Sequence, residues 1–120
     1  YGRTDWGRIF AMAAATLGTF LNTFAVVLNN HIPAAICVVI TFYVALRIWY
    51  DGRREWRYFA VAGFFSAMCV VTELPAAAFF AAIGVAMLIW SLRQTALAFV
   101  PAVAIVAAAY FGTNYIAHDS

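Results

Sequence analysis

Leu28-Asn29-Asn30-His31-Ile32-Pro33 is a short polar interruption in an otherwise apolar part of the chain. No Asp, Glu, Lys or Arg occurs from residue 9 to residue 46. An α-helix rises about 1.5 Å per residue, so a bilayer core of about 30 Å needs roughly 20 residues. The run is too long for one crossing and has the right length for two. It therefore predicts a transmembrane hairpin with Asn29, Asn30 and His31 at its tip.

The composition of the whole chain supports the same interpretation. Hydrophobic residues make up 67% of the 120 residues and charged residues 10%, with a mean hydropathy of +0.90. Soluble domains carry about 45–50% apolar and about 25% charged residues. A small soluble domain buries only about two thirds of the surface that its chain exposes, so it could not hide this much apolar surface. We expect an all-α fold, a polytopic transmembrane helical bundle formed by residues 1–120 as one membrane domain.

Five spans are predicted, at about residues 8–27, 32–50, 58–72, 76–92 and 96–117. Pro33 falls in the first turn of the second span, where proline is tolerated. Asp51-Gly52 is a turn signal that opens the most polar loop. Glu73 precedes Pro75 closely, and helical geometry is disfavoured just before proline, so the third span is expected to end there.

The first span is the most polar one. Thr16, Thr19 and Thr23 share one face of a helix, with Asn22 beside them. Small and polar residues on one stripe are typical of membrane helices that contact other helices. We therefore expect this span to lie inside the bundle, with its threonine stripe facing protein.

The basic residues define the orientation in the membrane. All seven are arginine, and five crossings place all of them on one side. Cytoplasmic loops of membrane proteins are enriched in Lys and Arg, so this side is expected to be cytoplasmic, with the N-terminus inside and the C-terminus outside. The arginines expected to face cytoplasmic headgroups are Arg47, Arg53, Arg54, Arg57 and Arg93.

The same basic residues indicate the type of organism and the membrane in which we expect the protein. Arginine without lysine, together with many alanines, is typical of a GC-rich genome. We expect an integral protein of the bacterial inner (cytoplasmic) membrane, and we expect no nucleic-acid partner. Because the chain begins at Tyr1 and stops directly after an apolar segment, it is expected to be part of a longer chain.

The outer side carries the candidate polar site, formed by Asn30, His31 and Glu73. Imidazole and carboxylate could contact a phosphate, bind a metal or act as a base. Alternatively, His31 satisfies free backbone groups at helix ends, and Glu73 is stabilised by the N-terminal dipole of the next helix. The chain has no His-Glu-x-x-His or Cys-x-x-Cys motif. No metal site is therefore predicted, and the catalytic residues and any cofactor stay undetermined.

Cys37 and Cys69 each lie about one turn from the outer side, at similar depth. A disulfide between them is conceivable. Buried free thiols that act as small hydrophobic side chains are far commoner in such places. Both alternatives stay open at this point.

Two segments resemble a recurrent part of membrane glycosyltransferases. They are the run from Gly18 to Ala35, which includes the Asn-His tip, and the run from Gly63 to Ala76, which includes Glu73. The resemblance is to the GT-C group, which includes protein mannosyltransferases and aminoarabinose transferases. It implies sugar transfer from a polyprenyl-phosphate donor at the outer membrane face. The acidic outer loop that carries the group's catalytic acid is missing here, so only an outer-face location is carried over to Asn30, His31 and Glu73.

The function expected from this resemblance is that of a membrane-embedded portion of a glycosyltransferase that acts on a lipid-phosphate sugar donor. The alternatives are a non-catalytic helical subunit or scaffold of a larger membrane complex, and a transporter fragment. The centre of each predicted span lacks ionisable residues, which argues against an ion-coupled pump. The expected partners are the lipid bilayer, a polyprenyl-phosphate sugar and other membrane subunits.

Overall fold

The computed structural model describes residues 4–18 and 31–118. Within these two ranges the chain is helical and contains no strand, so the all-α prediction is confirmed. The chain divides into two compact units, residues 1–32 and residues 33–120, and each unit is described by itself.

Helix α1 (Asp5–Leu17) is the one helix that the structure describes entirely within the first unit. Thr4 caps it by accepting a hydrogen bond from the Gly7 N–H at 3.1 Å. The Thr16 hydroxyl donates to the carbonyl oxygen of Met12 at 2.8 Å, so it is satisfied by its own helix. The rest of the predicted stripe, Thr19, Asn22 and Thr23, lies outside the described residues.

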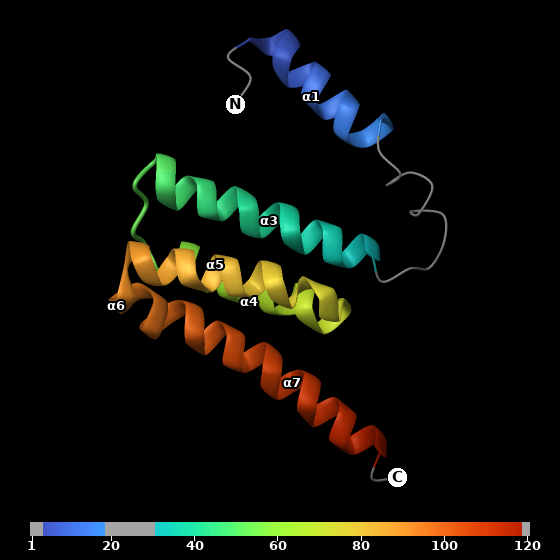
Figure 1. Cartoon of the computed structure of the whole chain (residues 1–120), viewed down its shortest axis with the longest axis vertical. Coiled ribbons are helices and arrows are strands. Elements are labelled where there is room, and N and C mark those ends of the chain that lie inside the picture. Colours follow the sequence, from blue (N-terminus) through green and yellow to red (C-terminus); the bar gives the residue numbers. More distant parts are fainter. Residues whose placement is uncertain (1–3, 19–30, 119–120) are drawn as a thin grey trace. The chain divides into compact units, whose positions relative to one another are not determined.

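Four main helices and three short segments follow in the described residues, and all of them belong to the second unit except His31 and Ile32 at the start of the first helix. In chain order they are α3 (His31–Tyr50), α4 (Trp56–Thr72), the 3₁₀ turn η1 (Leu74–Ala76), α5 (Ala77–Trp90), α6 (Leu92–Gln94), the π-helical turn η2 (Thr95–Phe99) and α7 (Val100–His118). Figure 1 shows α3, α5 and α7 in succession across the unit, with α4 behind α5. These bounds lie close to the predicted spans at 32–50, 58–72, 76–92 and 96–117.

Two described helical segments are long and apolar enough to cross a membrane by length and composition. They are His31–Tyr50 and the continuous segment Leu92–His118. The segments Trp56–Thr72 and Leu74–Trp90 are apolar but shorter. Two of the five predicted spans therefore meet the length criterion, and a bundle of five spans stays a prediction.

The turns between these helices form where the sequence predicts them. At the end of α3, Gly52 adopts a φ of 62° and the Arg53 N–H donates to the Arg47 carbonyl at 3.4 Å. This is the pattern of a helix that ends on a left-handed glycine. At the end of α4, Glu73 has extended backbone angles and η1 follows, with Pro75 in its first turn.

The core of the second unit is built around α4. Fully buried Ile48 of α3, Phe59 of α4 and Met87 of α5 meet in one cluster with Ala98 and Phe99 of η2. Small residues on α4 allow the neighbouring helices to approach closely. These residues are Ala62, Gly63, Ser66 and Ala67, and all are buried.

The closest approach is between Gly63 of α4 and the backbone of Phe99 in η2. A Cβ atom built on Gly63 would lie 2.5 Å from the Phe99 carbonyl oxygen, which leaves no room for any side chain. The π-helical turn at Thr95–Phe99 precedes Pro101, which has no N–H to donate. Local π adjustments of this kind re-satisfy the backbone near a proline in membrane helices. Here the Val100 N–H donates to the Thr95 carbonyl.

Candidate functional site

The predicted outer-face site is described for two of its three residues. Asn30 and its neighbour Asn29 lie outside the described residues. His31 is the first residue of α3 and is exposed. Glu73 lies between α4 and η1 and is half-buried, with its N–H donating to the Cys69 carbonyl at 2.9 Å. His31 belongs to the first unit and Glu73 to the second, so a cavity shared by the two stays a prediction.

The described residues contain no group of three or more His, Cys, Asp and Glu side chains that could hold a metal ion. Cys37 near the start of α3 and Cys69 near the end of α4 are both buried free thiols. They form one small cluster with Ala34, whose carbonyl oxygen lies 3.6 Å from the Cys69 Sγ atom and accepts its S–H. In this structure the two cysteines therefore act as packed hydrophobic side chains between α3 and α4.

The arginine end of the second unit is its most polar region. We use this name for Arg47, Arg53, Arg54, Arg57 and Arg93 together with Asp51 and Glu55. In Figure 1 the loop between α3 and α4 and the short helix α6 lie at the same end of this unit. The sequence predicted this gathering from the expectation that its loops alternate between the two sides of a membrane.

Ion pairs hold three of these five arginines. Arg47 Nη1 lies 2.6 Å from Asp51 Oδ2, one helical turn later, and the Arg47 guanidinium also lies 5.9 Å from the centre of the Tyr43 ring. Arg53 Nη1 lies 3.1 Å from Glu55 Oε1, and Arg57 contacts the other carboxylate oxygen of Glu55. The hydrogen bond from Arg57, with the charges of both arginines, lowers the pKa of the Glu55 carboxyl.

The other two arginines of this end, Arg54 and Arg93, are exposed. Neither forms an ion pair with another residue in the part of the chain that the structure describes. The arginine end thus carries five guanidinium groups against two carboxylates, and both carboxylates are engaged. Its excess positive charge resides mainly on Arg54 and Arg93.

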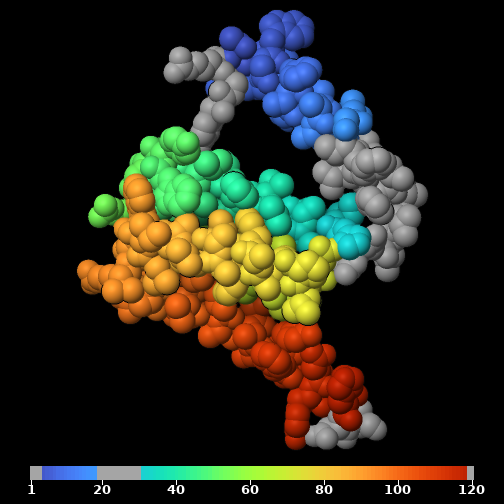
Figure 2. Space-filling model, viewed as in Figure 1, coloured from blue at the N-terminus to red at the C-terminus, as the bar shows by residue number. Residues whose placement is uncertain are grey.

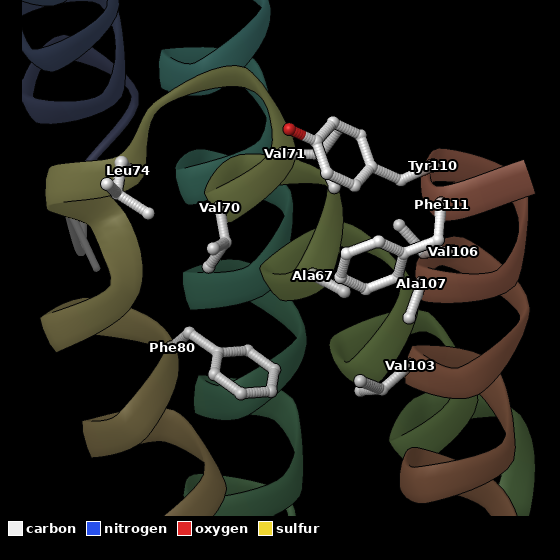
Figure 3. Close-up of a pocket in the computed structure, with 10 residues that line it drawn as sticks. All are labelled: Ala67, Val70, Val71, Leu74, Phe80, Val103, Val106, Ala107, Tyr110 and Phe111. Carbon is white, nitrogen blue, oxygen red and sulfur yellow. The ribbon is translucent and has the colours of Figure 1, made fainter. Parts of the chain in front are cut away.

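An apolar groove lies at the opposite end of the second unit, with a volume of about 290 Å³. Figure 3 shows Leu74 and Phe80 on one wall, residues of α7 on the other wall, and Ala67, Val70 and Val71 of α4 between them. The Tyr110 hydroxyl is the only oxygen among the side chains drawn there. The α7 wall consists of Val103, Val106, Ala107, Tyr110 and Phe111. Sequence reasoning missed this groove, because it forms only where α7 packs beside α4 and α5.

The C-terminal part of α7 is highly exposed. Every residue from 108 to 118 is exposed, and Figure 2 shows this segment, in red, projecting from the rest of the second unit. Exposed Phe111, Tyr115 and Ile116 give it a large apolar surface. Large exposed apolar surfaces are typical of sites that contact lipid or another protein.

The described residues therefore offer an apolar groove at one end of the second unit and a cationic surface at the other. Comparison with protein families, curated proteins and solved structures found no match to this chain.

Proposed function

We propose that the chain is a membrane-embedded helical module with its arginine end on the cytoplasmic side. The observation that supports this most directly is the exposure of its two longest apolar helices. Only 33% of the most apolar window in His31–Tyr50 and 28% of that in Leu92–His118 is buried. A core helix of a soluble protein would be mostly buried. Lipid is the solvent that suits helices that are both apolar and exposed.

The proposal keeps the five crossings expected from the sequence. Helices of 17 residues, such as α4, measure about 25 Å, which is less than a bilayer core of about 30 Å. Short spans are accommodated by local thinning of the bilayer and by residues at the helix ends that extend to the headgroups. Arg47, Trp49 and Trp56 stand at the cytoplasmic ends of α3 and α4 in this arrangement.

Cysteine labelling tests the orientation. We expect Arg53→Cys to be protected from a membrane-impermeant thiol reagent in intact cells, and His31→Cys to react. Both changes are made in a chain whose native cysteines are replaced by alanine. Permeabilised cells provide the control, since position 53 must then react as well. Labelling of position 53 in intact cells would contradict the proposed topology.

Within the membrane, the module is suited to packing against other helices. Residues 108–118 of α7 are all exposed and include several large apolar side chains. This supports a role as a non-catalytic subunit or scaffold that associates with further membrane helices through α7. A transporter fragment would use the same surface.

A second candidate function is a portion of a polyprenyl-phosphate-dependent glycosyltransferase, and the apolar groove favours it. The groove begins at Leu74, directly after Glu73, and its lining is almost entirely aliphatic and aromatic. A branched isoprenoid chain fits such a lining. Its phosphate would then lie near the end of α4, where the sequence predicts the outer membrane face.

Filling the groove tests this candidate. We expect Ala107→Trp, which places an indole in the groove, to reduce photolabelling by a photoreactive polyprenyl phosphate at least fivefold. Ala108→Trp is the matched control, because Ala108 is exposed and does not line the groove. Equal labelling of both variants would count against a donor site in the groove.

A further inference from the structure

We propose that the arginine end binds the phosphate groups of anionic phospholipids, and that Arg54 and Arg93 are the residues that contact them. This inference rests on the proposed membrane embedding and deepens it by naming the ligand and its contacts. It starts from an imbalance of charge at this end. Arg47, Arg53 and Arg57 are each engaged by Asp51 or Glu55.

Arg54 and Arg93 differ from the other three arginines in their surroundings. Both are exposed, and within residues 4–18 and 31–118 no ion pair engages either of them. A guanidinium presents a planar fork of N–H donors that matches the oxygens of a phosphate group. Both residues can therefore bind a phosphate without breaking an existing ion pair.

The start of α4 adds to the attraction for an anion. Glu55 occupies the N-cap position of α4, and its carboxylate accepts hydrogen bonds from the side chains of Arg53 and Arg57 and does not cap the backbone N–H groups of the first turn. The N-terminus of a helix carries partial positive charge and attracts anions. This N-terminus lies just two residues after Arg54.

The aromatic residues at this end indicate a lipid as the source of the phosphate. Trp49, Tyr50 and Trp56 are all exposed beside the loop that carries Arg54. Exposed Trp and Tyr are enriched at the level of lipid headgroups, where their rings are partly in hydrocarbon. A phosphate bound at this depth therefore belongs to a headgroup, and anionic headgroups supply the net negative charge that attracts arginine.

The test uses the full chain reconstituted into nanodiscs that contain phosphatidylglycerol mixed with phosphatidylcholine. Retained phosphatidylglycerol is counted by native mass spectrometry after release from the bilayer. We expect Arg54→Gln and Arg93→Gln each to lower its retention about fivefold, the effect of one arginine near an anionic surface. Arg8→Gln is the control that also removes one positive charge, and it should leave retention unchanged because Arg8 is already paired with Asp5 at 3.5 Å.

Three outcomes would overturn the inference. Equal retention by Arg54→Gln, Arg93→Gln and Arg8→Gln would show that total charge, and not these two positions, governs lipid binding. Displacement of the lipid by millimolar inorganic phosphate would assign the site to a free anion. A chain that does not co-float with phosphatidylcholine vesicles would refute membrane embedding itself, which separates failure of the proposed function from failure of the lipid site.

Discussion

Replacing Gly63 with alanine is expected to lower the free energy of unfolding of the second unit by about 2–3 kcal/mol. The new methyl group would lie 2.5 Å from the carbonyl oxygen of Phe99 and 3.0 Å from its Cα atom. Both atoms belong to the backbone of η2, so no side-chain rotation can relieve the overlap. The helices must separate, and the close packing of α4 against η2 and α7 is then lost.

Gly84→Ala is the matched control for this change. Gly84 also lies within a helix, but a Cβ atom built there meets nothing within 4 Å. Alanine is the better helix former, so this variant should be neutral or slightly more stable. Thermal unfolding of both variants in the same detergent, followed by circular dichroism, gives the comparison. Equal stability would mean that α4 and η2 do not meet as closely as described.

The contact at Gly63 illustrates why helix packing is hard to predict from the sequence. Gly63 and Ala67 are four residues apart, a spacing of small residues that is common where membrane helices approach closely. This spacing does not identify the helix that α4 contacts, because the partner depends on the π-helical turn at Thr95–Phe99. Pro101 follows this turn, and several distortions can accommodate a proline, so the sequence alone does not specify a π-helical turn.

The helix bounds were easier to predict than the packing. Gly52 and Pro75 interrupt helices for local reasons, namely a left-handed backbone angle and a missing N–H. Such local rules placed the ends of α3 and α4 within two residues of the structure. The number of crossings depends on how helices of 14 and 17 residues match a bilayer, and local rules do not decide that.

The candidate site was harder to predict for a related reason. The arginine end was foreseen because charge follows from residue type and loop order alone. Its ion pairs depend on finer geometry, such as Arg47 and Asp51 standing one helical turn apart at the end of α3. The apolar groove needs the lateral arrangement of α4, α5 and α7, which no run of residues in one segment reveals.

Placing a charge on the exposed face of α3 tests whether lipid surrounds this helix. Val39 lies near the middle of α3 and is 66% exposed. In water, a substitution at such a surface position changes stability by at most about 0.5 kcal/mol. At the centre of a bilayer, arginine costs about 2.5–3.5 kcal/mol of insertion free energy. We therefore expect Val39→Arg to lower the equilibrium constant for insertion of α3 by about a hundredfold. Glycosylation mapping in microsomes measures the inserted fraction from which this constant is obtained.

Tyr50→Arg is the control for this prediction, because Tyr50 ends α3 and is 75% exposed at the arginine end. An arginine there extends its guanidinium to the headgroups and costs little. Val39→Leu controls for a change of shape without charge and should insert as the native chain does. Both arginine variants add the same charge, so a difference in insertion between them reports the depth of the position in the membrane. If both arginine variants insert equally, the exposed face of α3 meets water or a polar partner, and lipid is not its solvent.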